Sequence, residues 1–216
     1  MDYSETAIFI MEIVGTVAFA SSGAILAIHR EMDLFGVIVL GVTTSVGGGL
    51  VRDLILGIVP PGMFSNPVYT MVAIGVSLLV FLWMYFRAGS SRMAKKVEKA
   101  YEEMLFLSDS VGLGIFTVVG VNTARNAGYD QTFLLVFVGV LTGVGGGLMR
   151  DIMAEEKPYI LHKHVYAVAS IAGAVLCVYS GRLAGRLVSM TAGAALVLLL
   201  RVLAARYRWN LPKIRL

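Results

Sequence analysis

The sequence predicts an all-α integral membrane protein with seven transmembrane helices: two inverted three-helix repeats followed by a seventh helix. Of the 216 residues, 57% are hydrophobic and only 15% are charged, whereas a soluble domain is about one quarter charged. The apolar residues form unbroken runs of about twenty without a two-residue alternation, which indicates membrane helices rather than a β-barrel. A long sequence motif that occurs twice predicts the repeats.

The apolar runs are separated by short polar or proline-containing segments. We expect spans at about 7–28, 34–56, 68–86, 105–123 and 132–153, and two shorter spans within 165–203. The predicted units are 7–87, the first three-helix repeat; 88–104, a basic cytoplasmic linker; 105–181, the second repeat; and 184–206, the seventh helix. Within the linker, 95–104 is a candidate interfacial helix.

The motif that occurs twice is rich in glycine and ends in the dipeptide Arg-Asp. Residues 47–53 read Gly-Gly-Gly-Leu-Val-Arg-Asp, and residues 145–151 read Gly-Gly-Gly-Leu-Met-Arg-Asp. A shift of 97 or 98 residues aligns the flanking spans as well, and it places Glu12 on Asp109. Because each unit has three spans, the second copy must enter the membrane with opposite polarity. Proteins built in this way have their binding or conduction site near the midplane, between the repeats.

The basic residues predict the orientation, because positive charge concentrates on the cytoplasmic side. With the N-terminus outside, the inner segments hold 13 basic residues: Arg30, Arg87, Arg92, Lys95, Lys96, Lys99, Lys157, Lys163, Arg201, Arg206, Arg208, Lys213 and Arg215. The outer segments hold 3: Arg125, Arg182 and Arg186. We therefore expect the N-terminus outside and the C-terminus in the cytoplasm. Cations in loops between spans do not indicate a nucleic-acid partner.

The glycine triplets need a physical reason, since each glycine inside a helix costs roughly 1 kcal/mol relative to alanine. Small residues spaced four apart, such as Gly41, Ser45 and Gly49, are typical of close helix packing. Packing does not account for the neighbouring glycines, which lie on other helix faces. At the triplets we expect the helical backbone to be loosened, so that its carbonyl groups line a path suited to cations. The candidate pore and kink residues are Gly47, Gly48, Gly49, Gly145, Gly146 and Gly147.

The matched charges are the second group of candidates: Arg52, Asp53, Arg150, Asp151, Glu12 and Asp109. Adjacent residues point about 100° apart on a helix, so we expect each arginine to pair with a group on another helix rather than with its neighbour. The candidate partners are the aspartate of the opposite repeat, Glu12 or Asp109. The alternative role is a structural clamp or a charged helix end that reaches the membrane surface.

Hydroxyl side chains near the triplets are candidates for polar pore lining: Thr43, Thr44, Ser45 and Thr142. The alternative is that each bonds to the backbone of its own helix. The sequence contains no Gly-x-Ser-x-Gly and no Walker motif, and His29, His162 and His164 lie in loops without further nearby ligands. We expect no enzyme activity, no resident metal and no cofactor.

The doubled Gly-Gly-Gly-Leu-x-Arg-Asp, the matching Pro60 and Pro158, and Asp109 within 107–113 resemble the prokaryotic branch of the trimeric intracellular cation channel family. Sequences of this kind were also labelled putative glycine transporters. The resemblance implies seven spans, a homotrimer in the lipid bilayer of the prokaryotic plasma membrane, and a pore inside each protomer. It further implies monovalent cations, chiefly K⁺, as permeant ions, and kinks at 47–49 and 145–147.

Three functions are compatible with such an arrangement: a cation channel, a secondary transporter of a small solute such as glycine, and a scaffold without transport. Two matched glycine triplets and matched charges argue against the scaffold. The residues alone do not separate the first two functions, because inverted repeats serve both. The family resemblance favours the potassium channel.

Overall fold

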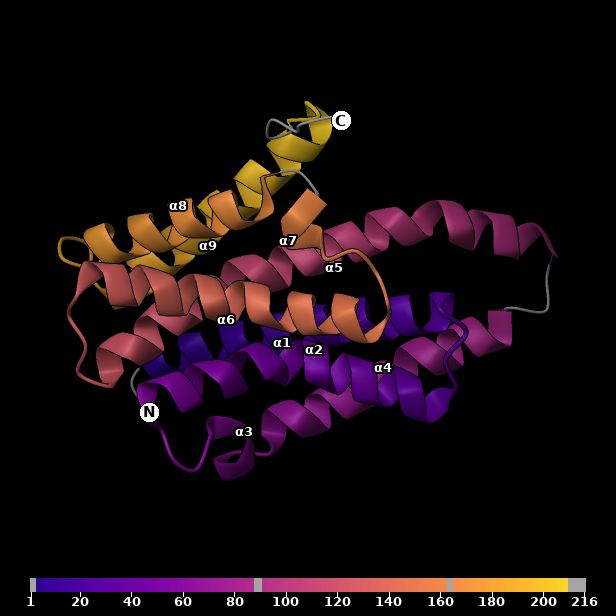
Figure 1. The fold of residues 1–216 in the computed structure, drawn as a ribbon, viewed down its shortest axis with the longest axis horizontal. Helices are drawn as coiled ribbons and strands as arrows, with labels where there is room; N and C mark the ends of the chain where they lie inside the picture. The colour runs from indigo at the N-terminus through magenta and orange to yellow at the C-terminus, as the bar shows by residue number, and fades with distance from the viewer. Residues whose placement is uncertain (1–2, 88–90, 163–164, 210–216) are drawn as a thin grey trace.

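The computed structural model describes residues 3–87, 91–162 and 165–209, and every regular element in these segments is a helix (Figure 1). The helices are α1 (Tyr3–His29), α2 (Leu34–Leu56), α3 (Gly62–Ser65), α4 (Val68–Arg87), α5 (Ser91–Asn126), α6 (Thr132–Met153), α7 (Tyr159–His162), α8 (Tyr166–Ser180) and α9 (Arg186–Arg206).

The bounds of α2 follow from its capping residues. The Asp33 side chain accepts a hydrogen bond from the Gly36 backbone N–H at 2.7 Å and so satisfies one of the free donors at the helix start. At the other end, Gly57 adopts a left-handed conformation with φ 69°, which glycine adopts without steric cost. The predicted span 34–56 matches this helix, and the predicted span 132–153 matches α6.

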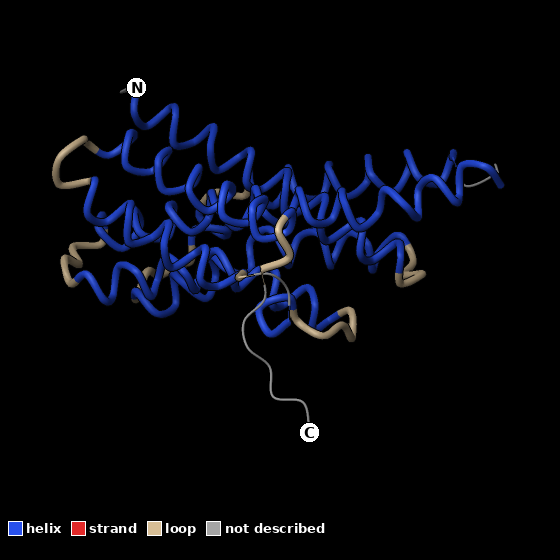
Figure 2. Tube along the Cα trace, turned by 90° about the horizontal axis from the view of Figure 1, so that it is seen from above, coloured by secondary structure: helices blue, strands red, loops and turns tan. Residues whose placement is uncertain are grey.

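The segment that was expected to be a linker with an interfacial helix at 95–104 is different in the structure. Here α5 begins at Ser91 and continues to Asn126, so 91–104 forms the first part of the same 36-residue helix. Because 91–111 contains strong helix formers and neither glycine nor proline, nothing in the sequence ends the helix before the span. At the right of Figure 1, the first part of α5 extends beyond the other helices, and Figure 2 shows the same bundle, turned by 90°, to be made of helices joined by loops.

Six of the described helices are long and apolar enough to cross a membrane: α1, α2, α4, α5, α6 and α9. The remaining apolar helix, α8, has 15 residues, which is shorter than the roughly 20 residues of a typical span. The protein is therefore a multi-pass, all-helical membrane protein in its described segments. That α8 also crosses the membrane, as the sixth of seven spans, remains a prediction.

The helices pack in two groups of three. In the first group α1, α2 and α4 contact one another, and in the second group α5, α6 and α8 do so. The contacts between α1 and α5 and between α2 and α6 join the two groups, while α9 packs against α5 and α8. Figure 1 shows α1, α2 and α4 on one side of the bundle and α5, α8 and α9 on the other.

The two glycine triplets lie where α2 crosses α6. A Cβ atom on Gly48 would clash with the Thr142 carbonyl oxygen, and a Cβ atom on Gly146 would clash with the Thr44 carbonyl oxygen. Both helices are continuous through their triplets, and a kink at either triplet remains a prediction. Close contact between the two helix backbones explains these two glycines, as small residues do in other membrane helix pairs.

Candidate functional site

Two polar clusters are built from matched positions of the two repeats. The first contains Glu12 of α1 and the second contacts Ser22 of the same helix. Ten residues of helix separate these two positions, which corresponds to roughly 15 Å along α1. The clusters therefore lie at different depths of the bundle.

The first cluster surrounds a cavity of about 80 Å³. The Tyr69 hydroxyl donates to Glu12, and the Arg52 Nε donates to the Asp53 carboxylate at 2.8 Å. The second oxygen of Asp53 accepts the Gly62 backbone N–H at 2.7 Å, which fixes the loop after α2. The cavity lining combines these polar groups with hydroxyl side chains, glycine and apolar side chains. It includes Glu12, Thr16, Ser45, Gly49, Arg52, Asp53, Tyr69, Phe116 and Val119.

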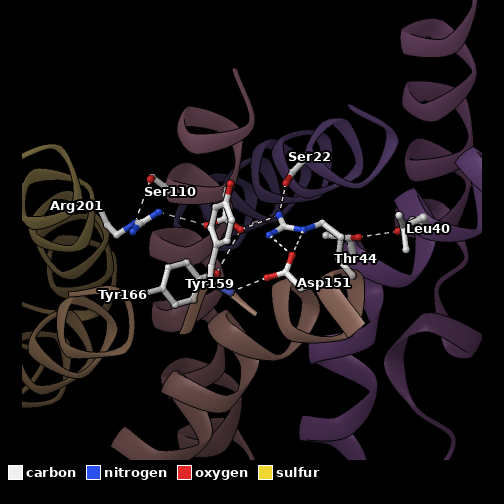
Figure 3. A network of polar contacts seen from close by, with 10 residues as sticks. Ser22, Leu40, Thr44, Ser110, Asp151, Tyr159, Tyr166 and Arg201 are labelled. Carbon is white, nitrogen blue, oxygen red and sulfur yellow. Dashed lines mark hydrogen bonds and ion pairs between the residues drawn. The ribbon is translucent and has the colours of Figure 1, made fainter. Parts of the chain in front are cut away.

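The second cluster is centred on Arg150 of α6, whose side chain has no exposed surface. One of its terminal nitrogens lies 2.8 Å from an Asp109 oxygen and also bonds to the Ser22 hydroxyl. Its Nε donates to Asp151 at 2.8 Å. The other Asp151 oxygen accepts the Tyr159 backbone N–H at 2.8 Å, as Figure 3 shows. A buried guanidinium is stable only when paired in this way.

A second arginine joins this cluster from α9. Arg201 was expected among the basic residues of the cytoplasmic segments, but the structure buries it completely. Its guanidinium lies 3.5 Å from the second Asp109 oxygen and donates from Nε to the Ser110 hydroxyl at 3.2 Å (Figure 3). The Tyr166 ring covers it at 4.7 Å from the ring centroid, which adds a cation–π contact. Sequence reasoning missed this residue because it lies near the end of the last apolar run and was counted with the basic residues of the C-terminal cytoplasmic segment.

The contacts of the first cluster recur in the second. Glu12 bonds to the hydroxyl of Tyr69, and Asp109 accepts from the hydroxyl of Tyr166 at 3.3 Å. In both clusters the arginine also bonds to the aspartate that follows it. The arginines of the two clusters differ in their pairing: Arg150 is bonded directly to Asp109, whereas Arg52 is bonded to Asp53 and its side chain is 14% exposed.

The expected arginine pairing is therefore only half correct. Arg150 pairs with Asp109 on another helix, which was one of the candidate partners. However, both arginines also bond to the aspartate that follows them in the sequence. We did not expect this bond, because adjacent residues point about 100° apart on a helix. The long, flexible arginine stem accounts for the difference, because it can bend back over the helix end even when the two Cα–Cβ bonds diverge.

The hydroxyl residues near the triplets bond mainly to their own helices. Thr44 donates to the Leu40 carbonyl at 2.6 Å, and Thr142 donates to the Val138 carbonyl at 2.7 Å. Ser45 donates to the Gly41 carbonyl at 2.7 Å and also lines the cavity of the first cluster. Thr43 is half-buried. The structure thus shows the backbone-bonding alternative for Thr44 and Thr142, and leaves Ser45 as a lining residue.

The remaining triplet glycines lie beside the two clusters. Gly49 lines the first cavity, and a Cβ atom there would meet only the Arg52 guanidinium at 3.7 Å. A Cβ atom on Gly147 would lie 2.9 Å from the Tyr166 hydroxyl and 3.3 Å from Asp109, and a Cβ atom on Gly47 would clash with the flexible Met149 side chain. Among the residues that the structure describes, no three His, Cys, Asp or Glu side chains are grouped as metal ligands would be.

Comparison with known sequences finds two copies of one family model in this chain. The model described as "Glycine transporter" matches residues 9–85 and again residues 106–182. The UPF0126 inner membrane protein YadS of Escherichia coli (strain K12) is 38% identical over 208 residues, which cover 95% of each chain. The UPF0126 membrane protein YvgT of Bacillus subtilis (strain 168) is 32% identical over 203 residues, with 94% of each chain covered.

Solved structures with the same fold are ion channels. A prokaryotic TRIC channel crystallised in 0.5 M KCl has a TM-score of 0.85 and 29% identity, with 96% of this chain and 100% of that chain covered. A TRIC cation channel studied for its conductance has a TM-score of 0.80 and 34% identity, over 96% and 97% of the two chains. The orthologue from Rhodobacter sphaeroides has a TM-score of 0.82 and 31% identity, over 94% and 100%.

Proposed function

Since the chain belongs to the prokaryotic trimeric intracellular cation (TRIC) channel family, we propose that it conducts monovalent cations, chiefly K⁺, through a pore inside each protomer of a homotrimer. The similar solved structures are described as cation channels, and one as a trimeric channel. The observation in this chain that supports the proposal most directly is Glu12. This carboxylate faces the first cavity, while the arginine of the same cluster is bonded to Asp53.

We infer that the path runs between the two repeats. The contacts that recur between the clusters, together with the two matches of one family model, support an inverted arrangement of the repeats. Between the clusters, the rings of Phe19 and Phe116 lie 5.2 Å apart at positions that the repeat also matches. On this proposal a cation enters the first cavity beside Glu12, passes the two rings and leaves beside the Arg150 cluster, which must rearrange to let it through.

Recordings from the purified protein in planar bilayers test this function. We expect discrete unitary currents in KCl, with cations more permeant than chloride. Glu12→Gln should lower the unitary conductance or the preference for cations, because it removes a negative charge from the cavity wall. Glu31→Gln, which removes an exposed carboxylate after α1, is the matched control and should leave both unchanged. Absence of unitary currents from the wild-type protein would contradict the channel.

The alternative is a transporter for a small zwitterion such as glycine. The first cavity favours it in one respect, because a carboxylate and a guanidinium, those of Glu12 and Arg52, line the same space of about 80 Å³. Saturable uptake of glycine into proteoliposomes, without unitary currents, would support the transporter and overturn the channel.

We further propose that the N-terminus lies outside and the C-terminus in the cytoplasm. Single cysteines at exposed positions test this orientation after Cys177 has been replaced by alanine. Ser65→Cys and Asn126→Cys should react with a membrane-impermeant maleimide in intact cells, whereas Glu31→Cys and Glu155→Cys should react only after lysis. The opposite pattern would reverse the topology without affecting the fold.

A further inference from the structure

A second cavity, of about 440 Å³, is lined by the end of α5 and the connection between α8 and α9. These segments lie at the end of the bundle that also holds the N-terminus (Figure 1). The cavity is lined by Arg125 at the end of α5, Arg182 between α8 and α9, and Arg186 at the start of α9. These are the three basic residues that the sequence places in outer segments. Because positive charge is rare in such segments, its concentration at one cavity requires a reason.

Two of the three arginines are held in place by the surrounding helices. Arg125 donates to the Val178 carbonyl at 2.6 Å, which satisfies an acceptor in the last turn of α8. Arg186 donates from Nε to the Asn122 side-chain oxygen at 2.6 Å and pairs with Glu5. These contacts fix the two guanidinium groups before any ligand arrives, and pre-organised groups bind with a smaller entropic cost.

The cavity retains an excess of positive charge. The cavity lining includes one carboxylate, that of Asp130. Among the residues that the structure describes, the only carboxylate in an ion pair with these three arginines is that of Glu5, which is half-exposed. The third arginine, Arg182, is exposed and lies over the Tyr179 ring at 5.6 Å. Planar guanidinium groups of this kind match the oxygens of a phosphate better than those of a halide ion.

The surface beside the cavity is apolar. Leu183, next to Arg182, is 92% exposed, and Tyr179 is 53% exposed. At the end of a membrane helix, apolar side chains of this kind face the acyl chains of lipids, while arginines lie at the depth of the headgroups. The cavity thus combines a phosphate-binding chemistry with an adjacent surface for hydrocarbon.

We propose that this cavity binds the headgroup phosphate of an anionic phospholipid, such as phosphatidylglycerol. Arg182 and Arg186 contact the phosphate, and Asn126 at the cavity wall is close to the polar remainder of the headgroup. None of the residues that line this cavity lines the cavity beside Glu12. Lipid binding here is therefore separate from the conduction path.

Native mass spectrometry of the protein titrated with phosphatidylglycerol or phosphatidylcholine tests the site. We expect the first phosphatidylglycerol to bind more tightly than phosphatidylcholine. Arg182→Gln should weaken phosphatidylglycerol binding by roughly fivefold, the effect of one arginine near an anionic lipid, and should leave folding intact because this exposed side chain holds no helix in place. The matched control is Arg206→Gln, which removes an exposed arginine from the other end of α9 and should have no effect on this binding.

Three outcomes would overturn the proposal: equal affinity for the two lipids, equal loss of binding in both variants, or no loss in Arg182→Gln. Competition between inorganic phosphate and the bound lipid completes the test. If phosphate displaces the bound lipid only weakly, the apolar surface contributes to binding as proposed. If phosphate alone binds as tightly as the lipid does, the cavity is a site for a soluble anion and the lipid assignment is wrong.

Discussion

Asp109→Asn should destabilise this protein more than any other single substitution that we consider. The Asp109 carboxylate has no exposed surface and lies between two buried guanidinium groups, 2.8 Å from that of Arg150 and 3.5 Å from that of Arg201. Asparagine keeps the size but removes the negative charge, so two buried cations lose the anion between them. Breaking a buried pair in this way costs about 3–5 kcal/mol. Thermal unfolding of the purified protein in detergent measures the loss.

The repeat provides a matched control for this substitution. Glu12→Gln changes the corresponding acid of the first repeat, but Glu12 is only half-buried and lies beside a cavity. We expect its effect on stability to be much smaller. In the Asp109→Asn background, Arg201→Gln should restore part of the lost stability because it removes one of the two facing cations. Equal unfolding temperatures for Asp109→Asn and Glu12→Gln would show that the buried cluster does not hold the bundle together.

The helices were predictable from the sequence because their signals are local. Apolar runs bounded by Asp33 and Gly57 define α2 at both ends, and the doubled motif relates it to α6. The extent of α5 was not predicted, since a charged segment of strong helix formers reads equally well as a separate interfacial helix or as the continuation of a span. Only the packing of the chain decides between these two structures.

The charged residues of the candidate site were predictable where the same kind of residue occurs at matching positions of the two repeats. Matching positions placed Asp109 among the candidate partners of the arginines before any distance was known. Ser22 and Arg201 were missed, because they have no charged or polar counterpart in the other repeat and their role depends on which helix faces they occupy. The signal for Arg201 was a lone arginine in an apolar helix, which more often marks a function than a helix end.

Gly48→Ala and Gly146→Ala should each prevent normal packing of α2 against α6. A methyl group at either position would meet a backbone carbonyl of the opposite helix, that of Thr142 or Thr44. A backbone cannot rotate away as a side chain can, so the two helices must separate. Overpacking costs about 1–3 kcal/mol where side chains can adjust, and we expect at least this loss here. Thermal unfolding and the yield of folded protein measure it.

Gly49→Ala is the control within the same triplet, and it separates packing from conduction. A Cβ atom at Gly49 would contact only the Arg52 guanidinium, at 3.7 Å, so alanine adds no clash and gains up to about 1 kcal/mol in helix propensity. Because Gly49 lines the first cavity, the added methyl group narrows the proposed path. We therefore expect Gly49→Ala to keep or raise the unfolding temperature while it lowers the unitary conductance. Unchanged current in a stable Gly49→Ala protein would place the conduction path elsewhere, whereas equal destabilisation at all three glycines would contradict the crossing geometry.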